Sequence, residues 1–139
     1  MPEPSERFTR YAGTIVDVVL PDGSRVSVRP GHPPPAELED LLPLLVITAW
    51  NPGGERPGAV TNEAANGELL TRLRALARDP HSVTILPAVG RAADNSHSEE
   101  SFAIHGIDRD DAIALGVHMR QDAIFEITPE GMVLVDCGG

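Results

Sequence analysis

A tryptophan, an asparagine and a glycine pair stand together where a run of apolar residues ends. Trp50 and Asn51 precede Pro52-Gly53-Gly54, and a helical pattern begins a few residues later. The backbone amides of such a turn, including that of Gly53, can hold an anion together with the start of the helix. The indole ring of Trp50 can stack on a flat ligand. The alternative is that Trp50 fills a gap in the core and the glycines only shape a turn. The spacing is not that of a P-loop, so the alternative stays open.

Two consecutive glutamates are the candidate acid–base groups. Because successive side chains of a strand point to opposite faces, Glu99 and Glu100 cannot act together as a carboxylate pair. One of them can point inward, where it would bind Arg91 or accept a hydrogen bond from a loop amide, or would instead serve as a general base. The sequence shows no nucleophile beside them, which favours the structural role over the catalytic one.

Other chemistry finds little support in the sequence. His97 and Glu99 lie at one end of a predicted strand and His105 at the other, at about 3.3 Å per residue, so their side chains should not converge on a metal. Cys137 lies in a predicted terminal tail with neither a helix start nor a histidine beside it. The final Gly138-Gly139 is better explained as a disordered tail than as the end of a ubiquitin-like carrier. We expect neither a metal nor a cofactor.

The elements that must position these residues begin with a hairpin. Residues 14–20 and 24–29 are rich in β-branched residues and flank Pro21-Asp22-Gly23, which is a hairpin signal. The proline-rich residues 30–35 cannot lie inside a helix or a central strand, so they predict a stiff connector. A short helical turn is expected at 36–42.

The remaining chain alternates between strand and helix patterns. The nearly continuous apolar run 44–50 predicts a central strand, buried on both sides. Helical spacing predicts a first helix that starts at Thr61, with Thr61 or Asn62 as its cap, and that is stopped by Asp79-Pro80. Asp108 is expected to begin a second helix. Further strands are predicted at 82–89, 99–105, 123–127 and 132–135.

This order of elements predicts an α+β fold with a ferredoxin-like βαββαβ core, mainly antiparallel and with two helices, plus an N-terminal β-hairpin and one extra C-terminal strand. We expect one domain. Its parts are a tail and hairpin (1–30), a connector with a short helix (31–43), an α+β core (44–136) and a tail (137–139).

Right-handed crossovers in this fold would bring several polar segments to one end of the sheet. They are the loop after Trp50, the helix start at Asn62, the hairpin loop 90–98 with Arg91, and the turn at Gln121. This end of the sheet is the predicted ligand-binding surface.

Bulk composition narrows the function classes. The formal net charge of −10 repels nucleic-acid phosphates and acidic membranes. No run approaches the ~20 apolar residues that span a bilayer, and the first residues lack the apolar segment of a secretory signal. The single cysteine excludes an internal disulfide. We therefore expect an acidic cytoplasmic protein that binds neither nucleic acid nor a membrane.

Several short motifs resemble a bacterial domain-of-unknown-function family, the one numbered 3293. They lie at residues 47–53 (ITAWNPG), Asn62, 87–90 (PAVG), 99–102 (EESF) and 121–125 (QDAIF). The chain departs from the family pattern at His97, where an aromatic residue is usual, and at Asp122, where an asparagine is frequent. The resemblance implies no activity. It does imply that Trp50, Asn51, Glu99 or Glu100, and Gln121 act together.

Three functional hypotheses follow from these observations. The first is a regulatory module that binds a small molecule or nucleotide through Trp50, Asn51, Gly53, Asn62, Arg91 and Gln121. The second is a protein-interaction domain that uses a sheet face or edge, including as a homodimer. The third is a hydrolase or transferase with Glu99 or Glu100 as the base, and a carboxylate in a cleft is the feature that would favour it.

Overall fold

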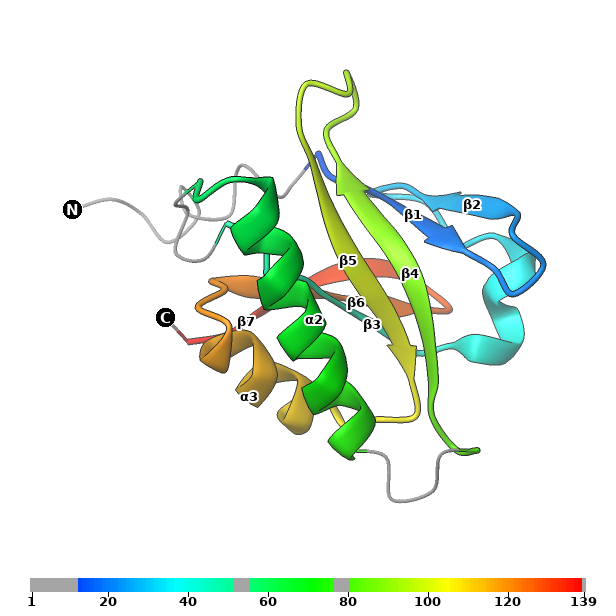
Figure 1. Cartoon of the computed structure of the whole chain (residues 1–139). Coiled ribbons are helices and arrows are strands. Elements are labelled where there is room, and N and C mark those ends of the chain that lie inside the picture. The colour runs from blue at the N-terminus through cyan, green and yellow to red at the C-terminus, as the bar shows by residue number, and fades with distance from the viewer. Residues whose placement is uncertain (1–12, 52–55, 77–80, 139) are drawn as a thin grey trace.

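Seven strands form a single antiparallel sheet in the computed structural model, which describes residues 13–51, 56–76 and 81–138 (Figure 1). The strand order is β2-β1-β4-β5-β3-β6-β7. The strands are β1 (Ile15–Val19), β2 (Arg25–Val28), β3 (Leu44–Ile47), β4 (Thr84–Arg91), β5 (Ser98–His105), β6 (Ala123–Thr128) and β7 (Gly131–Asp136). The helices are the 3-10 helix η1 (Ala36–Leu41) and the α-helices α2 (Ala59–Leu76) and α3 (Arg109–His118).

The N-terminal hairpin forms where its turn residues predict it. Gly23 has a φ of 87°, a conformation that favours glycine, and Asp22 accepts hydrogen bonds from the backbone and side chain of Ser24. The alternating valines of β1 and β2 are buried on one face of this hairpin. The predicted hairpin and the predicted short helical turn are both confirmed.

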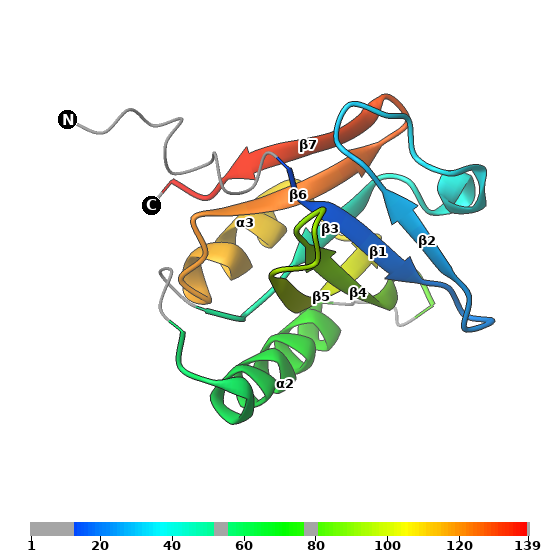
Figure 2. The ribbon, with the colours of Figure 1, turned by 90° about the horizontal axis from the view of Figure 1, so that it is seen from above.

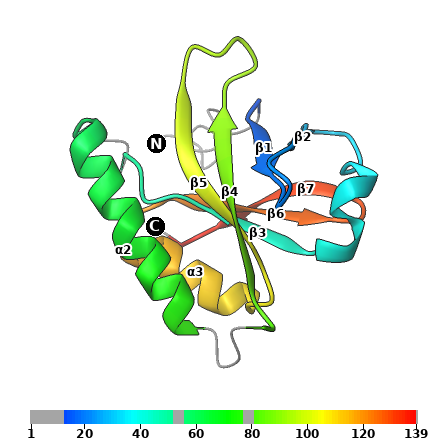
Figure 3. The same cartoon turned by 45° about the vertical axis from the view of Figure 1, so that its right-hand side comes forward.

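The central strand β3 is buried on both faces, as its apolar run predicts. Leu44 and Val46 belong to one hydrophobic cluster, while Leu45 and Ile47 belong to another. The second cluster lies under α2 and α3, which cover the same face of the sheet (Figure 3). The first fills the inside of the curl that the sheet makes (Figure 2) and includes Leu38 of η1.

The predicted ferredoxin-like core is wrong as a description of this fold. The hairpin is not an appendage to a helix-covered sheet, because β1 pairs with β4 over residues 15–18 and 88–91 and continues the same sheet. The seven strands curl into a half-barrel with a hydrophobic core on its inner face as well as under the helices. A ferredoxin-like core has its helices on one face and needs no second core inside a curl.

The first α-helix begins earlier than predicted, which changes the position of Asn62 within it. The helix α2 begins at Ala59, so Asn62 lies inside its first turns and not at the predicted cap. The residue is 3% exposed and its backbone N–H donates to the carbonyl of Gly58. Asp108 does precede α3, although its side chain makes no capping hydrogen bond. Within the described ranges, none of the helices could cross a membrane.

Candidate functional site

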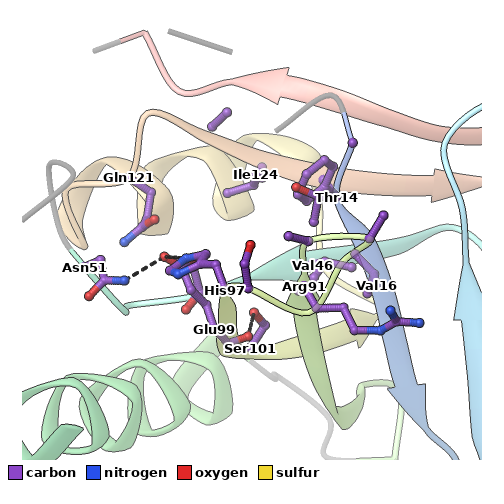
Figure 4. A pocket seen from close by; sticks show the side chains of 18 of the residues that line it. Thr14, Val16, Val46, Asn51, Arg91, His97, Glu99, Ser101, Gln121 and Ile124 are labelled. Carbon is purple, nitrogen blue, oxygen red and sulfur yellow. Dashed lines mark hydrogen bonds and ion pairs between the residues drawn. The ribbon is translucent and has the colours of Figure 1, made fainter. Parts of the chain in front are cut away.

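A cavity of about 670 Å³ opens on the inner face of the curled sheet (Figure 4). Its lining comes from the segment before and within β1, from β3 and the segment after it, from the β4–β5 hairpin and from residues 121–125, which lead into β6. Val16, Val46 and Phe125 contribute apolar walls, whereas Asn51, Glu99 and Gln121 contribute polar groups. The cavity therefore combines apolar surface with a small set of hydrogen-bonding side chains, as ligand sites commonly do.

Glu99 is the central polar group of this cavity. Its Oε1 accepts a hydrogen bond of 2.9 Å from Asn51 Nδ2 and lies 3.2 Å from His97 Nε2. The glutamate side chain is 23% exposed and that of His97 is 40% exposed. One carboxylate oxygen is thus held by two neighbours while the group remains accessible.

The alternation of β5 separates the two glutamates as the sequence predicts. Glu99 and Ser101 line the cavity on the inner face, whereas Phe102 packs against the cluster under the helices. Glu100 is exposed and lines a smaller hollow of about 320 Å³ beside α2. Only Glu99 is therefore placed to act in the cavity.

Asn51 is oriented from both sides by groups of known polarity. Its backbone N–H donates to Asn62 Oδ1 at 3.0 Å, so Asn62 Nδ2 must be the donor to Asn51 Oδ1, also at 3.0 Å. Asn51 Nδ2 is then the group that faces Glu99. The φ of Asn51 is 50°, a left-handed conformation that asparagine tolerates better than most residues.

Asn66 lies one helical turn after Asn62 and ties the segment after β3 to β5. Its Oδ1 accepts the backbone N–H of Ala49 at 2.8 Å, and its Nδ2 donates to the carbonyl of Glu100 at 2.8 Å. The residue is 7% exposed. Asn66 is therefore buried, because an asparagine four residues after Asn62 lies on the helix face that meets the sheet and can reach the ends of two strands.

Gln121 reaches toward Asn51 and Glu99 from the turn that precedes β6 (Figure 4). Its Nε2 donates to the carbonyls of Trp50 and Met119, at 3.0 and 3.3 Å. Because both partners are carbonyls, the orientation of the amide is fixed and its Oε1 remains the acceptor. Gln121 is 8% exposed and lines the cavity.

The other predicted ligand-binding residues are placed less directly. Trp50 is half-buried and does not line the cavity; its Nε1 is buried without a partner among the described residues. Gly53 lies outside the described residues. Arg91 lines the cavity, but its guanidinium turns away from Glu99 (Figure 4). The predicted contact between Arg91 and a glutamate is therefore not formed; Arg91 binds Asp17 instead.

Arg91 at the end of β4 and Asp17 on β1 form an ion pair that joins these two neighbouring strands. Arg91 Nε donates to Asp17 Oδ2 at 2.7 Å, and Ser27 Oγ donates to Asp17 Oδ1 at 2.6 Å. Burial on its own would raise the pKa of Asp17, but the hydrogen bonds from Arg91 and Ser27 and the charge of Arg91 outweigh burial and hold that pKa below its ordinary value.

Nothing in the described part of the chain gathers metal ligands. His97 and Glu99 are adjacent, but His105 is at the other end of β5, and no group of three His, Cys, Asp or Glu residues among those described could hold an ion. Cys137 is 4% exposed, with its backbone N–H bonded to the carbonyl of Asp122 at 3.0 Å. It is thus packed into the structure and does not belong to a frayed tail.

The model of one protein family matches residues 47–124, and that family is described as a protein of unknown function (DUF3293). The match covers more than half of the chain, so the chain belongs to this family. The matched segment contains Asn51, Glu99 and Gln121. Neither the curated proteins nor the solved structures gave a match.

Proposed function

We propose that this protein is a small-ligand-binding module whose ligand occupies the cavity on the inner face of the curled sheet. The observation that carries the proposal is the placement of Glu99, a carboxylate held by Asn51 and His97 at the polar end of that cavity. Strand ends and loops far apart in the sequence converge on this one group. Such convergence is typical of a binding site built on a rigid scaffold.

The cavity has the size and lining that a small molecule requires. Ligand sites commonly measure roughly 300–1,000 Å³ and combine apolar walls with a few fixed polar groups. Here the side-chain amide of Asn51 is held by the side chain of Asn62 and that of Gln121 by the carbonyl of Trp50, so both would lose little conformational freedom when a ligand binds.

A thermal-shift screen against nucleotides, amino acids, amines, sugar phosphates and organic acids tests this proposal. A ligand that binds the cavity raises the midpoint of unfolding with concentration, and Glu99→Gln reduces that rise. Glu100→Gln is the matched control, because it removes the same charge from the exposed face of the same strand. A ligand whose effect is equal in both variants binds elsewhere, which would contradict the proposed site.

One observation favours an enzyme as the second candidate. The carboxylate of Glu99 lies in a cavity with an imidazole 3.2 Å away, and either group can serve as a general base in a hydrolase or transferase. Hydrolysis of simple ester and phosphoester substrates, abolished in Glu99→Gln and retained in Glu100→Gln, would support this function. Glu100 no longer competes for the role of base, because it lies on the opposite face.

A protein partner or homodimer stays a prediction. The exposed large apolar side chains among the described residues are Val60, Val117 and Val133, which lie on α2, α3 and β7. Three separate elements carry them, so they do not by themselves make the contiguous patch that marks an interface.

A further inference from the structure

The polar end of the cavity presents hydrogen-bond acceptors. Oε1 of Glu99 already has two neighbours, but no donor among the described residues reaches its Oε2. Gln121 uses its Nε2 for two carbonyls, and its Oε1 likewise has no donor in the described part of the chain. Neither oxygen is a fully buried atom without a partner, so both remain open to solvent or to a ligand.

This polarity does not depend on an arbitrary choice of amide orientation. The Asn51 backbone N–H fixes Asn62 Oδ1 as an acceptor, which makes the Asn51 side-chain nitrogen the donor to Glu99. The carbonyls of Trp50 and Met119 fix the Gln121 nitrogen in the same way. Backbone groups thus turn the donors toward the protein and leave acceptors for the ligand.

Three positively charged or basic side chains line the cavity, and none of them donates a hydrogen bond to Oε2 of Glu99 or Oε1 of Gln121. Arg91 is taken up by Asp17 and by Asn95, whose Oδ1 accepts from Nη1 at 3.1 Å. His97 contacts the oxygen of Glu99 that Asn51 also holds. Arg56 lines the cavity from an exposed position, where water screens its electrostatic interaction with the acceptors.

We propose that the ligand of this cavity carries a cationic nitrogen group, an ammonium, amidinium or guanidinium, which donates its hydrogen bonds to Glu99 and Gln121. This inference rests on the proposed function and names the chemical class of its ligand. A hydrogen bond between a charged donor and a carboxylate is roughly twice as strong as a neutral one, and Glu99 supplies the carboxylate. The carbon frame of the ligand lies against Val16, Val46 and Phe125.

Three probes of equal chain length separate charge from shape: n-butylamine, n-butanol and butyrate. Each is titrated into the full-length protein at constant ionic strength, and the rise in unfolding temperature gives an apparent Kd. The amine is expected to bind about tenfold more tightly than the alcohol, and butyrate more weakly than both. Glu99→Gln should abolish the preference for the amine while leaving the alcohol unchanged, because the glutamine oxygen still accepts from Asn51.

The variants make each outcome decisive. Glu100→Gln changes the net charge equally and must keep the preference for the amine; its loss there would show a general charge effect and overturn the proposal. If butyrate binds most tightly and Arg56→Gln removes that binding, the cavity takes anions, so the ligand class is wrong while the binding function stands. If none of the three probes, and none of the compounds in the wider screen, acts through Glu99, the ligand class and the proposed function both fail.

Discussion

The side-chain nitrogen of Asn51 lies 2.9 Å from the carboxylate oxygen of Glu99, 48 residues further along the chain. This hydrogen bond joins the segment after β3 to the start of β5 at the polar end of the cavity. Asn62 holds the other side of the Asn51 amide. The position of the one carboxylate suited to binding is thus set by a helix and two strand ends together.

The Asn66 clamp predicts a large loss of stability when its amide is removed. Asn66→Ala leaves the N–H of Ala49 and the carbonyl of Glu100 without their partners inside the structure, and each such loss costs about 1–3 kcal/mol. We expect the free energy of unfolding to fall by about 2–4 kcal/mol. Urea unfolding followed by circular dichroism measures this change.

Glu63→Ala is the control for that experiment, since Glu63 is exposed on the same helix. Its effect should stay within about 0.5 kcal/mol. Equal effects of the two substitutions would show that the buried amide does not fasten the strands.

The ion pair between Arg91 and Asp17 predicts a dependence of stability on pH. The pKa of Asp17 is lower in the folded protein than in the unfolded chain, so its contribution is present above about pH 4, where the unfolded carboxyl is ionised, and is lost as pH falls through the folded pKa. Asp17→Asn should therefore be less stable than the wild type at pH 7, and this difference should shrink on acidification below about pH 4.

Urea unfolding of both proteins between pH 7 and 3 measures that difference. The exposed Asp40→Asn serves as the control for a change of one charge. A difference for Asp17→Asn that stays constant to pH 3 would contradict the assigned role of the pair.

The buried thiol predicts slow chemical labelling. Burial, followed by the charges of Asp136 and Asp122, raises the pKa of Cys137 to about 11. The pKa of an unfolded cysteine is about 8.5. At pH 8 the thiolate is therefore more than about 100-fold scarcer in the native protein than in the unfolded chain. A thiol-reactive disulfide reagent should label the native protein at least that much more slowly than the protein in urea. Equal rates would place Cys137 in a mobile tail.

Local sequence patterns predicted most elements but not the way they assemble. The Asp22-Gly23 turn and the apolar run at Leu44 fixed a hairpin and a central strand, because both signals depend on neighbouring residues. The curl of the sheet was missed. The alternating valines at 16 and 18 show that one face of β1 is buried, but they do not show that β1 continues the sheet beside β4.

The candidate site was predicted in its location more than in its contacts. Placing Asn51, Glu99 and Gln121 at one end of the sheet required only the direction of successive strands, and the structure brings these three residues to one cavity. The wall of Val16 and the pairing of Arg91 with Asp17 could not be foreseen, because they depend on β1 lying beside β4. Whether the cavity binds a ligand stays a prediction.

A titration followed by the side-chain amide signals of ¹⁵N-labelled protein tests the central claim most directly. n-Butylamine is added to the wild type, and the NH₂ signals of Asn51 and Gln121 report on the cavity, while that of Asn66 reports on the helix-covered face. A cationic ligand held by Glu99 predicts saturable shifts of the first two signals, with little change at Asn66, and in Glu99→Gln the same shifts should require about tenfold more amine. Unchanged signals for Asn51 and Gln121, or equal shifts in Glu99→Gln at the same amine concentrations, would contradict a cationic ligand held by Glu99.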